Sequence, residues 1–458
     1  MLSFVNGTPV ALDAIPTFSH EDFRKVFLDG SFDANLKRVL AMWRLPDARL
    51  ACVLGNPVTH RLEVCATDAA SYRPLRDEVP ALHRFEAELR GEENLRPFLP
   101  LKGEAAHEVA VGPVHAGVIE PGHFRFQCMG ETVHYLEIAL GYQHRGAEKL
   151  MAEATTDARR LALAETVAGD TSVAASFACA RALGLEPASA PLLNLALELE
   201  RIANHVGDLG ALAGDVAYLP TSSFCGRIRG EYLNMTAELC GNRFGRGMCR
   251  APIPSEETRA HLREWFLRTG KELFHALGLL FSEGSAIERF EGTGRVDAVT
   301  ARRIGLVGMA GRASGLAVDS RIDFPMEGEQ TMVPLCGEED MKGDVLARAG
   351  QRQLELLVSH ARVRRLFGGG TWSEASAKMS TPARQPRTLT VAVVEAWRGE
   401  LVHLAVTGES PEKIAQYKIF DPSYHNWFGL AQALRGEQIS NFPICNKSFN
   451  LSYCGVDR

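Results

Sequence analysis

The hydrophobic pattern changes its period along the chain. Near the N-terminus, short apolar runs at 50–54 and 61–65 have a period close to two, which predicts β-strands. From about 145 to 370, apolar positions recur every three or four residues, which predicts long helices. Beyond Arg387 the chain returns to β-like runs such as 389–394. The pattern predicts an α+β fold, in which a small α/β module precedes a mainly helical bundle domain with small flanking β-sheets.

The clearest predicted helix follows Pro191, because proline suits the first helical turn. Leucines and other apolar residues from Leu192 to Leu209 form one stripe, which we expect to be buried against other helices. A second stripe consists of Glu198, Arg201, His205 and Asp208. We interpret this second stripe as a salt-bridged, partly solvated face with His205 on a flank. The alternative is a polar pathway through the bundle.

Two further features lie between the N-terminal module and the helical part of the chain. The stretch 92–103 contains two prolines and many polar residues, and we interpret it as a domain boundary. Residues 108–138 are typical of a β-hairpin or small sheet. In that hairpin, Phe124 and Phe126 should point to one face, while His123 and its alternating neighbours point to the other.

Composition narrows the class of protein. Hydrophobic residues make up 46% and charged residues 23% of the chain, as expected for a packed core. The net charge of −6 argues against a nucleic-acid partner. Neither an apolar run long enough to cross a bilayer nor a signal-peptide pattern occurs, so we expect a cytoplasmic location, with membrane attachment through partner subunits. The ten cysteines form no Cys-x-x-Cys pair, which argues against a zinc site or iron–sulfur cluster held by this chain alone.

Five sequence motifs are more specific indicators of a protein family than the overall composition is. They are 112–115 with 120–125, 141–149, 198–205, 312–315 with 319–325, and 395–400. Together they resemble the superfamily that joins nickel–iron hydrogenase large subunits to the 49-kDa, quinone-site subunit of respiratory complex I. The most similar members are formate-hydrogenlyase-type, energy-converting-hydrogenase-related large subunits. The resemblance covers residues 108–458, whereas residues 1–100 resemble the 30-kDa complex I subunit through the acidic helix 85–90.

The chain departs from this family at the metal ligands. Nickel–iron hydrogenases hold their metals with two Cys-x-x-Cys pairs, since soft thiolates suit these metals. Ala168 and Thr171 stand at the first pair, and Ser452 and Gly455 at the second. Cys454 lies between the last two positions, out of register. The comparison with the family therefore implies no nickel–iron centre and no metal or cofactor bound by this chain alone.

The resemblance also implies candidate site residues. A quinone headgroup would meet a hairpin histidine, for which His115 and His123 are the candidates. Glu148 would be a proton relay and Arg398 the arginine that overhangs the site. The pocket would be lined by Ala168, Gly169, Asp170, Thr171 and Ser452. Because the family's tyrosine is replaced near Gly169, only half of the expected quinone pair is present.

Each candidate has a structural alternative. His115 and His123 could simply hydrogen-bond their own hairpin. Glu148 could belong to an ion-paired cluster at a helix start. For Arg398 we favour a structural role, in which it holds a buried carboxylate such as Glu395 or Asp170.

The sequence thus predicts the large subunit of a membrane-associated, complex I-like or energy-converting-hydrogenase-related oxidoreductase. Its expected partners are an iron–sulfur small subunit and antiporter-like membrane subunits. Its acceptor would be a quinone, with electrons coming from NAD(P)H or ferredoxin through the complex. The alternative is a redox-inactive structural or coupling subunit, and an active hydrogenase is the least favoured interpretation.

Overall fold

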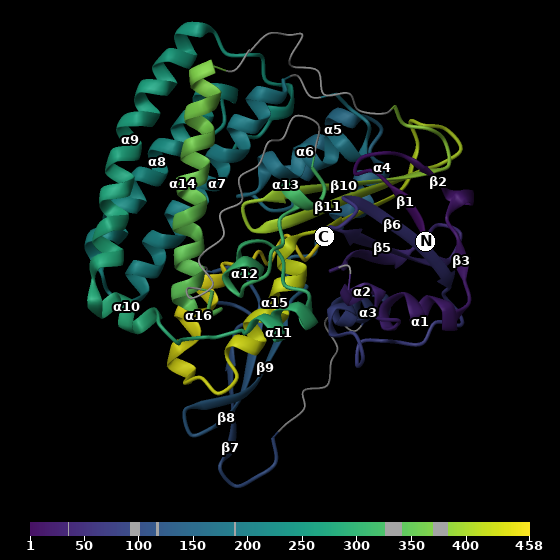
Figure 1. Ribbon diagram of the computed structural model, residues 1–458, viewed down its shortest axis with the longest axis horizontal. Helices are drawn as coiled ribbons and strands as arrows, with labels where there is room; N and C mark the ends of the chain where they lie inside the picture. The colour runs from purple at the N-terminus through teal and green to yellow at the C-terminus, as the bar shows by residue number, and fades with distance from the viewer. Residues whose placement is uncertain (35, 92–100, 116–118, 187–188, 326–340, 370–382) are drawn as a thin grey trace.

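The computed structural model describes all residues except 35, 92–100, 116–118, 187–188, 326–340 and 370–382 (Figure 1). The described residues form a helical bundle and three β-sheets. The predicted boundary at 92–103 lies mostly outside the described residues. The α+β class predicted from the hydrophobic pattern is confirmed.

The N-terminal module is a five-stranded sheet with strand order β1-β6-β5-β4, in which β3 pairs with β6. Its elements are β1 (Leu2–Phe4), β3 (Thr17–Phe18), α1 (His20–Leu28), α2 (Ser31–Ala34), β4 (Arg38–Arg44), β5 (Arg49–Asn56), β6 (Arg61–Asp68), η2 (Pro80–Leu82) and α3 (His83–Leu89). The three long strands are buried on both faces. The rest of the chain covers part of this surface: Trp43 Nε1 donates to Gln416 Oε1 at 3.0 Å, and Arg38 pairs with Glu400 at 2.7 Å.

A second sheet joins the two ends of the chain. Its strand order is β12-β11-β10-β2, so the N-terminal β2 (Val10–Ala11), followed by η1 (Leu12–Ala14), pairs with a C-terminal strand. The other strands are β10 (Thr388–Ala396), β11 (Gly399–Thr407) and β12 (Ile414–Phe420). All residues of β10 and β11 are buried, because this sheet lies in the centre of the molecule.

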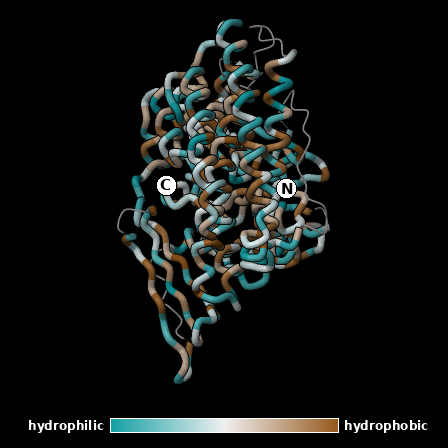
Figure 2. The backbone as a smooth tube through the Cα atoms, turned by 90° about the vertical axis from the view of Figure 1, so that its left-hand side faces the viewer, coloured by the Kyte–Doolittle hydropathy of each residue, from teal (hydrophilic) through white to brown (hydrophobic). Residues whose placement is uncertain are grey.

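The third sheet projects from the body of the molecule (Figures 1 and 2). It consists of β7 (Ala106–Val111), β8 (His123–Met129) and β9 (Thr132–Ala139), so the predicted hairpin has a third strand. Phe124 and Phe126 are fully buried on one face, and each contacts the ring of Phe442 at a centroid distance of 4.9 Å. The predicted alternation in this strand is confirmed.

Four long helices form the bundle (Figure 1). They are α7 (Ala190–Asp215), α8 (Leu219–Cys240), α9 (Glu256–Ser282) and α14 (Val345–Gly369). Helix α7 begins after the N-cap Ser189, whose side chain accepts from the backbone N–H of Leu192. The apolar stripe of α7 is buried as predicted, and Leu199 and Ile202 are almost completely covered.

The polar stripe of the same helix differs from its prediction. Glu198, Arg201, His205 and Asp208 are all at least 97% buried, and His205 is fully buried rather than on a flank. The expectation of a partly solvated face was wrong because α14 packs on this side of α7 and supplies the charged partners.

Shorter helices complete the fold. They are α4 (Ala147–Glu153), α5 (Asp157–Ala164), α6 (Ser172–Ala182), η3 (Met248–Arg250), α10 (Gly284–Phe290), α11 (Ala298–Ile304), α12 (Gly308–Ala313), α13 (Ser320–Asp323), α15 (Pro422–Ala433), η5 (Ile439–Asn441) and α16 (Phe442–Phe449). Within the described part of the chain, no helix combines the length and the apolar character that a bilayer crossing requires.

Candidate functional site

The segment between α5 and α6 contains Ala168 and Thr171, the first two positions at which we expect thiolates to be replaced. Buried Glu200 of α7 holds this segment: its carboxylate accepts the N–H groups of Val173 at 2.7 Å and Ala174 at 3.2 Å, at the start of α6. The side-chain amide of Asn204 donates to the Asp170 carbonyl at 2.9 Å. Burial raises the pKa of Glu200 to about 8, although the two backbone N–H groups oppose the shift.

Arg398 lies in the two-residue turn between β10 and β11 and binds Asp170 with two parallel hydrogen bonds. The distances are 2.8 Å from Nη1 to Oδ1 and 2.7 Å from Nη2 to Oδ2. Its Nε donates to the carbonyl of Asn450 at 2.7 Å, and its guanidinium lies over the ring of Trp397 at 3.9 Å. Burial disfavours the Asp170 carboxylate, but the Arg398 charge outweighs burial and leaves the pKa of Asp170 below its usual value.

The C-terminal tail contains Ser452 and Gly455, the other two positions at which we expect thiolates to be replaced. The backbone N–H of Gly455 donates to Ser452 Oγ at 2.9 Å. A Cβ at Gly455 would lie 2.8 Å from Ser452 Oγ and 2.9 Å from Asp421 Oδ2, so this position has no room for a side chain. Burial and the neighbouring Glu120 carboxylate raise the pKa of Cys454 to about 11, so its thiol stays protonated at neutral pH.

These segments meet at one place. Thr171 Oγ1 lies 3.3 Å from Arg398 Nη1, and Asn450, two residues before Ser452, accepts from Arg398. The hairpin loop joins them, since the backbone N–H of Cys454 donates to Glu120 Oε2 at 3.0 Å. The structure therefore brings the 167–171 segment, Arg398, the tail and the hairpin loop together. We call the Asp170–Arg398 pair with Thr171, Ser452 and Gly455 the central site.

The two candidate histidines make other contacts. His115 Nε2 lies 2.8 Å from the Gly122 carbonyl, which is the hydrogen bond within its own loop that the structural alternative describes. A Cβ at Gly112 would lie 2.8 Å from that imidazole, so the turn packs tightly around it. His123 lines a cavity between α3, α15 and the third sheet. The histidines therefore do not share one environment, and their predicted role in quinone binding stays a prediction.

Glu148 is part of an ion-paired cluster that joins distant segments. Its carboxylate lies 2.5 Å from Lys418 Nζ and 2.9 Å from Arg458 Nε. Lys418 also pairs with Glu88 of α3 at 2.9 Å. The cluster thus connects α3, α4, β12 and the C-terminal tail, in agreement with the structural alternative for this residue.

Sequence reasoning missed a buried network centred on Glu355 of α14. Its carboxylate accepts from Arg312 Nη2 at 2.5 Å and lies 3.1 Å from His205 Nε2 and 3.4 Å from Arg201 Nη1. Arg312 also binds Glu395 at 2.8 Å, so Glu395 is not the partner of Arg398. Burial opposes the charge of Glu355, yet the Arg312 guanidinium keeps the pKa of Glu355 well below its usual value.

Hydrogen bonds connect this part of the bundle to the central site. The Asn450 side chain donates to Asp208 Oδ1 at 2.6 Å, while Arg352 Nε donates to Asp208 Oδ2 at 2.9 Å. Arg201 and His205 lie within the motif 198–205, and Asp208 lies one turn beyond it. Arg312 lies in the motif 312–315. Glu355 had no such signal, because it is one of several charged residues on a helix whose neighbours are distant in sequence.

Comparisons with known proteins show which proteins this chain is similar to. Residues 215–369 match the family model "Respiratory-chain NADH dehydrogenase, 49 Kd subunit". Together with the relatives below, this match confirms the resemblance to the superfamily of hydrogenase large subunits and complex I 49-kDa subunits that the motifs predicted.

Individual relatives are distant. The chain is 27% identical to formate hydrogenlyase subunit 5 of Escherichia coli over 76% of its own length and 63% of that protein, so it spans less than two thirds of this relative. It is 26% identical to NADH-quinone oxidoreductase subunit 4 of Thermus thermophilus, over 76% of the chain and 93% of the relative. A chain of the membrane-bound sulfane sulfur reductase, described as an archaeal respiratory membrane complex, has the same fold, with a TM-score of 0.68, 22% identity and coverage of 78% and 100%.

Proposed function

We propose that this chain is the large subunit of a membrane-associated, complex I-like or energy-converting-hydrogenase-related oxidoreductase that works without a nickel–iron centre. Its partners would be an iron–sulfur small subunit and antiporter-like membrane subunits. Electrons would pass from the partner's cluster to a quinone or similar acceptor beside the central site. The names of the relatives, which are subunits of a formate hydrogenlyase and of an NADH-quinone oxidoreductase, support the type of complex.

The observation that carries the proposal is the side-chain chemistry of the central site. A nickel–iron centre requires thiolates, whereas Ala168, Thr171, Ser452 and Gly455 supply none. The residues present therefore do not fit a thiolate-held metal, and we assign no step to one.

The same geometry suits an acceptor that takes up protons with its electrons. The Asp170 side chain is 31% exposed, while Arg398 is 6% exposed and binds both carboxylate oxygens of Asp170. Arg398 stays protonated and can stabilise negative charge on a reduced acceptor. Glu200, which holds the start of α6, is a buried carboxyl whose pKa of about 8 suits proton exchange at neutral pH.

The test uses the complex purified from its native host. We expect a co-purifying iron–sulfur subunit, no stoichiometric nickel by elemental analysis, and reduction of a short-chain quinone analogue. Roughly one nickel per chain, or a monomer without an iron–sulfur partner, would contradict the proposal.

A redox-inactive coupling subunit is the second candidate. It is favoured by the continuous buried ion pairs and by the involvement of His115 in its own loop. Replacing His115 and His123 together by alanine should abolish quinone reduction and preserve assembly if they serve an acceptor site. Reduction at the normal rate would show that these histidines do not serve the acceptor, whereas absence of quinone reduction in the unchanged complex would favour the coupling role.

A further inference from the structure

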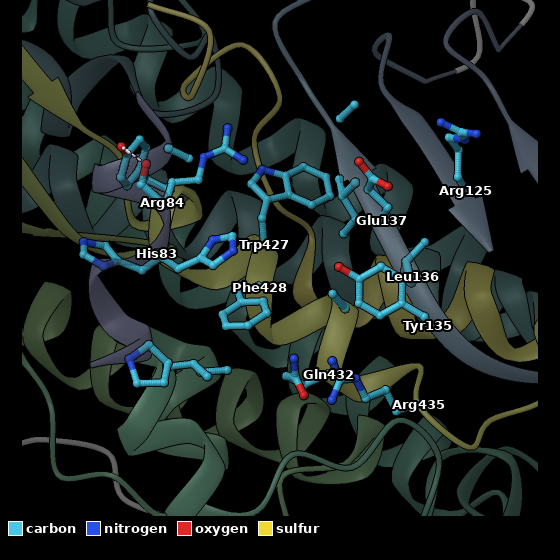
Figure 3. A pocket seen from close by; sticks show the side chains of 18 of the residues that line it. His83, Arg84, Arg125, Tyr135, Leu136, Glu137, Trp427, Phe428, Gln432 and Arg435 are labelled. Atoms are coloured by element: carbon cyan, nitrogen blue, oxygen red, sulfur yellow. Dashed lines mark hydrogen bonds between the residues drawn. The ribbon is translucent and has the colours of Figure 1, made fainter. Parts of the chain in front are cut away.

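A cavity of about 190 Å³ lies where the N-terminal module meets the large domain, and its lining residue Trp427 donates to the carbonyl of Ser452 in the central site (Figure 3). Its walls come from η2 and α3 of the module, from β8 and β9 of the third sheet, and from α15. Since a water molecule occupies about 30 Å³ in the liquid, this volume corresponds to roughly six waters, or to one substituted aromatic ring.

Aromatic rings form two walls of the cavity. The rings of His83 and Phe428 stack on each other with a centroid distance of 5.1 Å and an angle of 18° between their planes. Figure 3 shows Tyr135 across the open space from Phe428, with Gln432 and Arg435 along its lower edge. Walls of this kind favour a planar guest, which can stack on one ring and meet the edge of another.

The charges around the cavity favour an anion. Its lining carries three arginines, Arg84, Arg125 and Arg435, against the single acidic residue Glu137. Arg125 lies directly opposite Glu137 in the β8–β9 ladder and also pairs with Glu108 at 3.1 Å, so these charges largely balance. Arg84, on the module side, also lies near the Asp457 carboxylate, so the positive charge that a ligand would meet comes from Arg435 after α15.

Tyrosine rings orient both of these arginines. The guanidinium of Arg84 lies over Tyr424 at 5.4 Å, and that of Arg435 lies over Tyr135 at 5.8 Å. A guanidinium over a ring face is attracted by the ring's π electrons, and its N–H groups can still bind a planar carboxylate. Arg435 is exposed, so its charge lies at the entrance.

His425 provides a second, independent sign of a missing partner. Its side chain is only 6% exposed and lines both this cavity and a second one beside Val39 and Leu306, and its Nε2 has no hydrogen-bond partner among the described residues. Burial lowers the pKa of His425 to about 4, so the ring is neutral at pH 7. A buried nitrogen without a partner is costly, and a bound oxygen atom would remove that cost.

We propose that this cavity binds a compact aromatic carboxylate, with its ring between Phe428 and Tyr135 and its carboxylate group toward Arg435. Such a ligand would contact β9 and α15 of the large domain, next to His83 of the N-terminal module, whose ring stacks on Phe428. The site requires no electron transfer and does not rest on the function proposed above, although the candidate His123 also lines this cavity.

In the first experiment, the intact complex from its native host is titrated with benzoate, and the heat of binding is measured by isothermal titration calorimetry. We expect saturable binding of one benzoate per chain, at least tenfold tighter than the neutral isostere benzamide and tighter than inorganic phosphate. Absence of saturable benzoate binding at millimolar concentration would overturn the proposal. Equal binding of benzoate and benzamide would also overturn it, because the arginines would then have no part.

Variants locate the site. Arg435→Ala should weaken benzoate binding roughly tenfold, as expected for the loss of one charge-assisted hydrogen bond, and Arg435→Lys should lose less. Tyr135→Ala tests the ring wall by a change that does not touch the arginines' charge. Arg268→Ala, at an exposed arginine on α9, is the matched control and should bind normally. If Arg435→Ala and Tyr135→Ala complexes assemble and bind benzoate like the control, the assignment is wrong.

Discussion

The Glu355 network and the Asp170–Arg398 pair use the same chemistry in different surroundings. The Glu355 side chain is 1% exposed and has three cationic or potentially cationic partners, Arg201, His205 and Arg312. The Asp170 side chain is 31% exposed and has Arg398 as its main partner. A fully enclosed network must satisfy itself and so constrains how the helices pack, whereas a partly exposed pair keeps one edge accessible to another molecule.

Glu355→Ala should cause the largest effect. Removing the central carboxylate leaves Arg312 and Arg201 buried without their common partner, which costs about 3–5 kcal/mol. Chemical denaturation of the purified complex should show this loss, or the variant should fail to assemble. Glu264→Ala, at an exposed glutamate of α9, is the control and should change stability by less than about 0.5 kcal/mol. A loss below about 1 kcal/mol at Glu355 would mean that the network does not constrain the bundle.

Leu199→Ala measures the apolar face of the same helix. Leu199 is 1% exposed, so its truncation leaves a cavity and should cost about 2–5 kcal/mol in the free energy of unfolding. Comparison of this value with that of Glu355→Ala ranks packing against ion pairing within one interface. A negligible loss would contradict the burial of this stripe.

Asp170→Asn should separate function from stability. The amide keeps one oxygen acceptor for Arg398, and the site is partly solvated, so we expect a stability loss of only about 1–2 kcal/mol. Quinone-analogue reduction should fall at least about tenfold, since the charged carboxylate is lost. Glu153→Gln alters an exposed pair with Lys149 at 3.9 Å and should change neither quantity. Normal reduction combined with a large stability loss would assign Asp170 to the structural class of Glu355.

Glu200→Gln should cause the smallest effect at pH 5.5, where the folded carboxyl is neutral like the amide, and the variant should differ mainly in its pH dependence. Burial raises the pKa of Glu200 from the unfolded value near 4.5 to about 8. The folded protein therefore binds more protons than the unfolded chain between these values, so this carboxyl's contribution to stability is lost as the pH rises through that window. The variant cannot titrate there, and its stability should fall less between pH 5.5 and pH 8 than that of the unchanged protein. Parallel profiles from thermal denaturation would contradict the raised pKa.

The local pattern of apolar and polar residues was sufficient to predict these helices and strands. The period of the apolar positions predicted α7, with its proline start, and the alternation in β8 predicted the buried Phe124 and Phe126. The N-cap Ser255 and the acidic residues Glu256 and Glu257 at the start of α9 are a local signal of the same kind. These signals work because helix and strand periods depend on neighbours within a few residues.

The central site was partly predictable. The aligned motifs placed Asp170, Thr171, Arg398 and Ser452 in one region, and the preferred structural role of Arg398 identified Asp170 as one of two partners. The choice between Asp170 and Glu395 needed the structure, because Arg312 binds Glu395 and leaves Arg398 facing Asp170. The absence of space at Gly455 likewise depends on Asp421, which is distant in the sequence pattern.

The sequence by itself determined the fold class and the burial of the apolar faces, since these follow from residue type and spacing, whereas the expected replacement of four thiolates follows from the resemblance to the family. Only the tertiary structure decided which charges are buried and how they pair. The stripe from Glu198 to Asp208 has the spacing of a solvated helix face, and its burial results from α14, which arrives about 150 residues later and places Glu355 and Arg352 against it. The free energy of a charge depends on its distant partners and on the exclusion of water, and neither is encoded in a local period.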